Sequence, residues 1–153
     1  MNALSPIIPQ PDNAVRATLL ALSPELRQLC EDNDREHAIT EIKHLDPATV
    51  IAARLALEGQ MRPTGAQGVI AALTPLLAIY PQPERSEGEW RAWWAQYAED
   101  LADVPPAALQ EGVKAYRRGG DSEFFPKPGK LRALAWEAAA PLITALGRLR
   151  AAK

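Results

Sequence analysis

The chain has 153 residues, of which 47% are hydrophobic and 24% charged, and its formal net charge is −2. This length and composition are typical of one globular domain large enough to bury a hydrophobic core. The single cysteine, Cys30, excludes an intrachain disulfide. The N-terminal residues lack the pattern of a signal peptide, and no apolar run is long enough to cross a membrane. We therefore expect a cytoplasmic protein without a membrane partner.

The charge is unevenly distributed along the chain. Residues 1–105 carry 8 Lys and Arg against 15 Asp and Glu, a net charge of −7, whereas residues 106–153 carry 9 against 4, a net charge of +5. A basic C-terminal region favours an anionic partner, such as nucleic acid or an acidic protein surface. An ordinary solvated helix surface explains the same bias, because a dedicated DNA-binding domain is usually far more basic.

The N-terminal part predicts an arm followed by short helices. Residues 1–12 contain three prolines and little periodicity, which is typical of a flexible arm. Short helices are expected over residues 13–63, because Ser23-Pro24 and Asp46-Pro47 each place an N-cap residue before a proline at the first helical position. The last of these helices is expected to turn one apolar stripe inward, formed by Val50, Ile51 and Leu55.

Residues 64–153 predict longer helices that form a helical core. Thr64 is expected to cap a helix that runs to about Tyr80 with a kink at Pro75. Ser86 and Glu89 have the spacing of a capping box, which begins a helix rich in aromatic residues. Two further helices are expected to begin at Pro106 and near Lys130, the second kinked at Pro141. Because β-branched residues are scarce and no strand pattern is convincing, we predict an all-α fold, a compact bundle of six to eight helices, several of them short.

The aromatic helix presents an apolar stripe at helical spacing, formed by Trp90, Trp94, Tyr97 and Leu101. Core packing is the simplest interpretation of this stripe. Trp93 borders it, and adjacent residues on a helix point about 100° apart. Trp93 and Trp94 therefore cannot both face the core, and Trp93 is a candidate for contact with a partner, because tryptophan is enriched at interface hot spots.

No motif of catalysis, cofactor binding or metal binding is convincing. His37, Glu41 and His44 share a helix face, but their spacing does not match the His-Glu-x-x-His zinc motif. Gly129-Lys130 is followed by leucine rather than the Ser or Thr of a P-loop, and the glycines near Gly65 do not follow a strand. Cys30 lies in an apolar pattern with no base beside it. We therefore expect a protein that is not an enzyme and that uses no metal or cofactor.

The stretch "SEFFPKPGKLRAL" places two phenylalanines in a turn before the last helix. Pro126 keeps Phe125 extended, and Pro128 suits the first turn of the helix. Either ring can fill a junction between helices, and the other can remain exposed as an anchor for a partner. The candidate partner-binding residues are Trp93, Phe124, Phe125 and Lys127. The candidate nucleic-acid-binding residues are Lys114, Arg117, Arg118, Lys127, Lys130 and Arg132.

The order of these motifs resembles a family of small phage and prophage proteins related to the phage helicase loader/inhibitor proteins. The matching positions are Tyr80-Pro81, Trp90, Tyr97, Leu101, Pro105, Ala108, Tyr116, Phe124-Phe125-Pro126, Pro128 and Leu131. The resemblance covers about residues 64–138, and it departs at Lys130, where the family more often has an acidic residue. It implies a helical protein that binds a hexameric replicative helicase.

Three functions remain open at this point. The first is a non-enzymatic adaptor of phage-type DNA replication that binds a replicative helicase or another replisome protein. The second is a small nucleic-acid-binding regulator that uses the basic C-terminal region. The third is a self-associating assembly protein in which two copies pair along a seam of the last helix, formed by Leu142, Leu146 and Leu149.

Overall fold

The computed structural model describes residues 14–120 and 122–153, and within them the only regular elements are helices. The elements, in chain order, are α1 (Ala14–Leu20), α2 (Pro24–Glu31), α3 (Arg35–Lys43), α4 (Pro47–Gln60), α5 (Gly65–Leu73), the 3-10 helix η1 (Thr74–Ala78), α6 (Glu87–Leu101), α7 (Pro106–Arg118) and α8 (Pro128–Ala151). The predicted all-α class is confirmed. The arm predicted over residues 1–12 lies outside the described residues. None of the helices in the described ranges is both long and apolar enough to cross a membrane.

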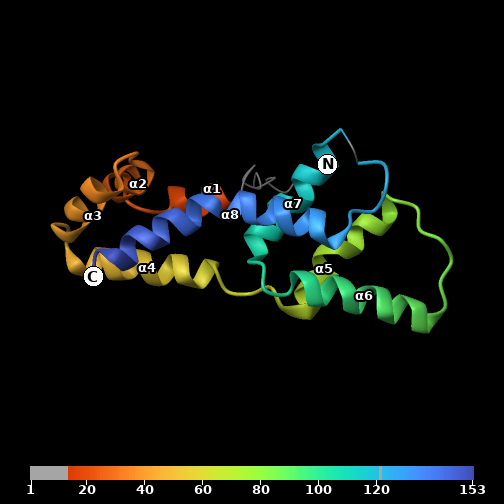
Figure 1. Ribbon diagram of the computed structural model, residues 1–153. Helices are drawn as coiled ribbons and strands as arrows, with labels where there is room; N and C mark the ends of the chain where they lie inside the picture. Colours follow the sequence, from red (N-terminus) through yellow and green to blue (C-terminus); the bar gives the residue numbers. More distant parts are fainter. Residues whose placement is uncertain (1–13, 121) are drawn as a thin grey trace, which may run out of the picture.

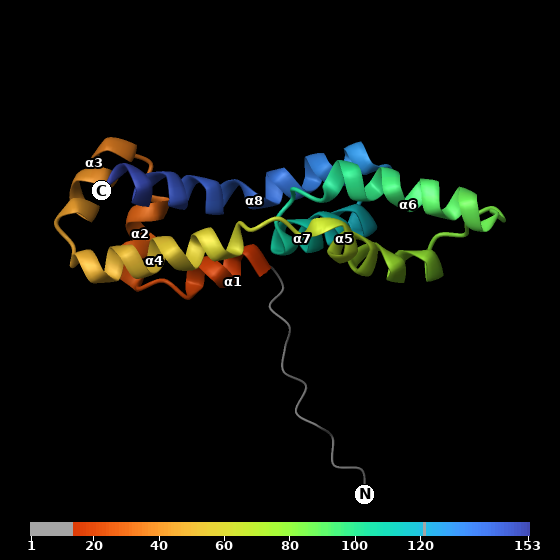
Figure 2. The same cartoon turned by 90° about the horizontal axis from the view of Figure 1, so that it is seen from below.

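Helix α8, with 24 residues, runs along most of the molecule and contributes to two hydrophobic cores (Figures 1 and 2). Its N-terminal half packs against α6 and α7, and its residues such as Leu131 and Ala135 belong to a hydrophobic core that also includes residues of α5 and η1. Its C-terminal half packs against α1, α2, α3 and α4 through residues such as Leu142 and Leu149. The short N-terminal helices therefore share a core with the end of α8, while the predicted boundary between residues 13–63 and 64–153 stays a prediction.

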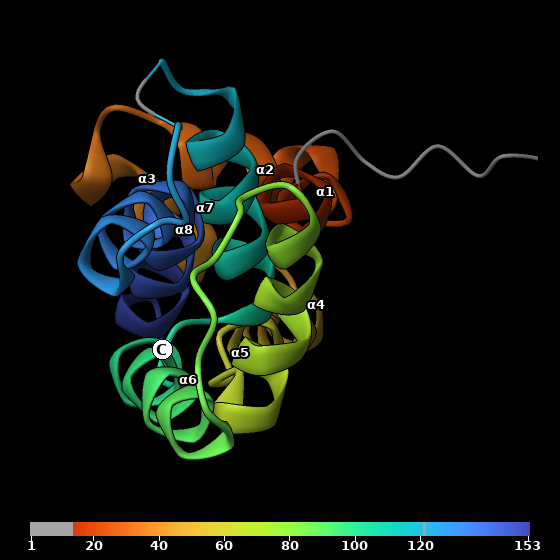
Figure 3. The same ribbon diagram turned by 90° about the vertical axis from the view of Figure 1, so that its right-hand side faces the viewer.

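The closest helix pair is α7 with α8, and a glycine allows the approach. A Cβ atom added to Gly112 on α7 would lie 2.9 Å from the backbone nitrogen of Ala135 on α8. Real side chains do not tolerate that distance, so only glycine fits here without moving the helices. Figure 3 views the molecule from the end that holds α5 and α6, where the connection formed by residues 79–86 crosses from η1 to α6.

Two of the predicted helix starts are confirmed in detail. The Ser23 hydroxyl accepts a hydrogen bond from the backbone N–H of Leu26, so it caps α2 as expected. Ser86 and Glu89 form the predicted capping box at the start of α6, in which each side chain accepts a hydrogen bond from the other residue's backbone N–H. These local signals determined the helix starts correctly because they depend only on neighbours in the sequence.

Two other helix starts differ from the prediction. Thr64 does not cap α5, because its hydroxyl donates instead to the carbonyl of Val104, across the loop that follows α6. The helix expected to continue through Pro75 ends at Leu73 and gives way to η1. Proline lacks the N–H that an α-helix needs at this point, and a 3-10 turn accommodates the change. Asp46 precedes α4 as predicted, but its carboxylate accepts from the Thr49 hydroxyl rather than from a backbone N–H.

The apolar stripe predicted for α4 is confirmed at Val50, which packs against the core, and is wrong at its other two positions. Ile51 and Leu55 are 47% and 57% exposed, whereas Ala53 and Leu57 are buried in the core. Helix α4 itself carries alanine and larger apolar residues on several of its faces, so the spacing of apolar residues alone did not identify the buried face. Ala53 and Leu57 lie in the core that α4 shares with α8, and Ile51 and Leu55 are left at the surface.

Two buried charged side chains tie the N-terminal helices to the rest of the molecule. Glu111 on α7 accepts hydrogen bonds from the backbone N–H of Ala14 at 2.9 Å and from Lys114 at 3.2 Å. Arg148 on α8 donates to the carbonyls of Leu29 and Cys30 at 2.7 and 3.0 Å. These backbone groups lie at helix ends, where no partner within the helix is available. Side chains from α7 and α8 therefore bind the free backbone N–H at the start of α1 and the free carbonyls at the end of α2.

Candidate partner-binding surface

Two tyrosine hydroxyls hold the turn formed by residues 122–127, here called the Phe-Phe-Pro turn. Tyr116 on α7 donates a hydrogen bond to the carbonyl of Phe124 at 2.6 Å, and Tyr97 on α6 donates to the carbonyl of Pro126 at 2.6 Å. The turn leaves the end of α7 and reaches the start of α8 beside η1 (Figure 1). Carbonyls on both sides of Phe125 are thus bound, which determines how the backbone between them is oriented.

Phe125 points into the aromatic part of the core and is only 9% exposed. Its ring centroid lies 4.8 Å from that of Trp93, 5.5 Å from that of Tyr97 and 6.4 Å from that of Tyr80. The tilted and edge-to-face geometries of these pairs are those that aromatic rings prefer. Phe125 therefore anchors the turn to α6 and to Tyr80, two residues after η1.

Phe124 is 76% exposed, which makes it the most exposed large hydrophobic residue within the described ranges. Phe124 is thus exposed while its neighbour Phe125 is buried. The Tyr116 hydroxyl binds the Phe124 carbonyl and so restrains the backbone that carries the exposed ring. Binding through a residue on an ordered backbone costs less conformational entropy than binding through a disordered segment, and aromatic residues are enriched at protein interfaces.

Trp93 lies at the centre of an aromatic cluster rather than free at its border. Its ring centroid is 4.6 Å from that of Tyr97, 4.8 Å from that of Trp94 and 5.3 Å from that of Trp90. The Arg85 guanidinium lies 4.9 Å from the Trp93 ring centroid, within range of a cation–π interaction. Trp93 is half-buried against the core, so its packing role is established by these contacts, and any contact with a partner would use its remaining edge.

Four of the predicted cationic residues are exposed and form no ion pair within the described part of the chain. These are Arg117, Arg118, Lys127 and Lys130. Arg117 and Arg118 close α7 and precede the Phe-Phe-Pro turn, and Lys127 and Lys130 follow Phe124 closely in the sequence. These four cations flank the exposed ring in the sequence, and the exposed carboxylate of Glu123 lies directly beside it.

The other two predicted cationic residues, Lys114 and Arg132, form ion pairs within the chain. Lys114 donates to the buried Glu111. Arg132 forms a bidentate pair with Asp103, donates to the Asp100 carbonyl at 2.9 Å, and lies 5.7 Å from the Trp136 ring centroid. The hydrogen bonds from Arg132 lower the pKa of the Asp103 carboxyl below its ordinary value. Sequence position alone did not separate these cations from the four solvated ones.

The leucines predicted as a self-association seam are not at the surface. Leu142, Leu146 and Leu149 are at most 4% exposed and belong to the core that α8 shares with the N-terminal helices. This correction has a simple physical reason, because the residues expected to pair with a second copy already pack within the chain.

Sequence reasoning did not identify the positioning role of the two tyrosines. The apolar stripe that contains Tyr97 and the resemblance position Tyr116 do not predict a hydroxyl that binds a turn carbonyl. Burial raises the pKa of Tyr97 to about 12, partly offset by the positive charge of Arg85. The hydroxyl therefore keeps its proton and remains a donor to Pro126 at any physiological pH.

The residues that the structure describes include no group of three or more His, Cys, Asp or Glu side chains arranged to hold a metal ion. No protein-family model matches the chain, and neither a curated protein nor a solved structure matches it significantly.

Proposed function

We propose that this protein is a non-enzymatic adaptor of phage-type DNA replication, which binds a replicative helicase or another replisome protein through the surface around Phe124. The observation that supports the proposal is the 76% exposure of Phe124 in a turn that two tyrosine hydroxyls hold in place. A solvent-exposed phenylalanine forgoes most of the roughly 1.5–3 kcal/mol that burial of its side chain would contribute. A partner with an apolar pocket would recover that contribution on binding.

The balance of exposed charges near Phe124 in the sequence favours a partner pocket with an acidic rim. Arg117, Arg118 and Lys127 are exposed, against one exposed carboxylate in the described part of the turn, Glu123. An apolar centre surrounded by complementary charges is typical of protein interfaces, in which the charges increase the association rate and select the partner. The choice of a replicative helicase as the partner rests on the resemblance of residues 64–138 to the helicase loader/inhibitor proteins.

The proposal is tested by capture of partners from a nuclease-treated host lysate, followed by mass spectrometry. Three baits are compared: the wild-type chain, Phe124→Ser, and the control Ile143→Ser. Ile143 is also exposed, at 46%, but lies on the C-terminal half of α8. We expect the replicative helicase with the wild type and the control, and its loss with Phe124→Ser. Helicase recovered equally with all three baits would contradict the role of Phe124, and no helicase with any bait would contradict the partner.

Direct nucleic-acid binding is the second candidate function, favoured by the four solvated cations Arg117, Arg118, Lys127 and Lys130. If they contact phosphates, affinity for DNA must fall steeply as salt rises, because each contact releases condensed counterions. A double variant, Arg117→Gln with Arg118→Gln, would then weaken binding and reduce the salt dependence. Absence of DNA binding at low salt would exclude this candidate.

A further inference from the structure

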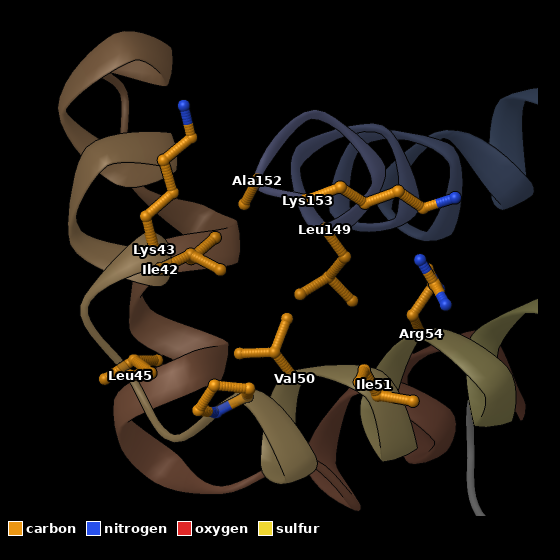
Figure 4. A pocket seen from close by; sticks show the side chains of 10 residues that line it. Ile42, Lys43, Leu45, Val50, Ile51, Arg54, Leu149, Ala152 and Lys153 are labelled. Atoms are coloured by element: carbon orange, nitrogen blue, oxygen red, sulfur yellow. The ribbon is translucent and has the colours of Figure 1, made fainter.

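A pocket of about 510 Å³ lies between α3, α4 and the end of α8, in the half of the molecule remote from the Phe-Phe-Pro turn (Figure 4). Ile42, Val50 and Leu149 form its apolar centre, and Ile51 lies at its edge with 47% of its surface exposed. This volume is in the range of pockets that bind small molecules in proteins, about 300–1,000 Å³. The pocket is separate from the surface used in the proposed function.

The charged residues that line this pocket are all positive. Lys43, Arg54 and Lys153 line it, and no Asp or Glu is among the ten described residues that do so. Figure 4 shows Arg54 and Lys153 on one side of the apolar centre and Lys43 on another. An apolar floor with cations at its rim is complementary to a molecule that has an apolar body and an anionic head.

Arg54 provides the second, independent observation. Its side chain is only 20% exposed, yet it forms no hydrogen bond within the described part of the chain, and its Nε atom is buried without a partner. The nearest carboxylate, Glu58, is 4.0 Å away and is itself bound to Arg150 at 3.3 Å. A guanidinium in so sheltered a position normally forms several hydrogen bonds. Arg54 thus has one long ion pair, with Glu58, and no hydrogen bond within the described part of the chain, at the edge of an apolar pocket.

We propose that this pocket binds a small amphipathic organic anion, an aliphatic chain ending in a carboxylate. The carboxylate would accept hydrogen bonds from Arg54, with Lys153 beside it, because a planar guanidinium can bind both oxygens of a carboxylate at once. The aliphatic chain would lie over Val50, Leu149 and Ile42. This site adds a small-molecule ligand to the protein and does not depend on the proposed replication partner.

The experiment is a titration of the full chain with decanoate, followed by NMR of the isoleucine methyl groups. We expect saturable shifts of the Ile42 and Ile51 methyls, with a dissociation constant on the order of 1 mM or tighter. The methyls of Ile79 and Ile143 are the internal controls, because both side chains are exposed and neither lines the pocket. Decyltrimethylammonium, which has the same chain length and the opposite charge, is expected to produce no saturable shift.

Two variants test the role of charge. Arg54→Gln is expected to weaken decanoate binding about tenfold, whereas Arg62→Gln, which removes the same charge from an exposed residue just after α4, should change it by less than about twofold. Ile51→Glu places a carboxylate at the pocket edge and should abolish binding. Since Ile51 is half exposed, this variant should melt like the wild type.

Several results would overturn the proposal. These are no saturable shift with decanoate, equal binding of the cationic analogue, equal shifts at Ile79 and Ile143, or equal effects of Arg54→Gln and Arg62→Gln. Each would mean that the pocket has no preference for an amphipathic anion.

Discussion

The Tyr97 hydroxyl on α6 donates a 2.6 Å hydrogen bond to the carbonyl of Pro126, in the turn that leads into α8. Both groups are buried, so neither has ready access to water as an alternative partner. This single bond connects the aromatic helix to the turn that presents Phe124. It restrains the backbone of an irregular segment close to the residue that carries the exposed ring.

The burial of the Tyr97 hydroxyl makes the stability of the fold fall at alkaline pH. Burial raises the pKa of Tyr97 from its ordinary value of 10 to about 12. Because the folded-state pKa is higher, the contribution of Tyr97 is fully present below pH 10 and is lost as the pH rises to about 12. The loss should reach about 2–3 kcal/mol. Urea denaturation between pH 9 and 12 should show this loss in the free energy of unfolding of the wild type. The Tyr97→Phe variant should lack this contribution to the pH dependence. Parallel curves for the two proteins would contradict this account.

The two phenylalanines of the turn should differ sharply in their effect on stability. Phe125→Ala removes a buried ring and should destabilise the fold by about 3–5 kcal/mol. Phe124→Ala removes an exposed ring and should change stability by less than about 0.5 kcal/mol. Chemical denaturation of both variants provides the comparison. Similar losses from the two substitutions would mean that the turn does not direct the rings to opposite sides.

Two glycines should respond to alanine in opposite ways. Gly112→Ala forces a Cβ atom against the backbone of Ala135, so it should separate α7 from α8 and destabilise the fold by about 1–3 kcal/mol. Gly147 lies within α8, and a Cβ atom there would meet nothing within 4 Å. Gly147→Ala should therefore stabilise the fold by roughly 0.5–1 kcal/mol through helix propensity. Thermal melting of the two variants checks the sign of each effect, and a stabilised Gly112→Ala would refute the close approach.

Cys30 should be an unreactive thiol in the folded protein. Burial raises its pKa from the ordinary value of 9.0 to about 11, although the positive charge of Arg148 opposes the shift. Since only the thiolate reacts, alkylation by iodoacetamide at pH 8 should be about 100-fold slower in the native chain than in urea. Mass spectrometry of timed samples measures both rates. Equal rates would show that the α2–α8 junction opens readily.

The sequence predicted the helices best where local chemistry dominates. The Ser23 cap and the Ser86 capping box each depend on atoms only three residues apart, and the structure confirms both. The α4 stripe was wrong at Ile51 and Leu55 because this helix is apolar on several sides, so the contact with α8 determined which face is buried. A distant contact also explains why Thr64 does not cap α5. Its hydroxyl binds the carbonyl of Val104, in the loop after α6, rather than a backbone N–H of its own helix.

The candidate surface was predictable only in part. The unusual Phe-Phe-Pro sequence identified the turn and left open that one ring is buried while the other remains exposed. Which ring is buried depended on Trp93, Tyr97 and Tyr80, whose arrangement in space no periodicity revealed. The pairing of Arg132 with Asp103 and the cationic pocket around Arg54 likewise bring together residues distant in the chain.

The most direct test of the central claim is the affinity of the purified chain for a purified hexameric replicative helicase from the host, measured by biolayer interferometry. We expect specific binding by the wild type and by Ile143→Ser, and at least about tenfold weaker binding by Phe124→Ser, a loss of about 1.4 kcal/mol or more. Equal binding by all three proteins, or no binding by the wild type, would contradict the claim that Phe124 anchors a helicase partner.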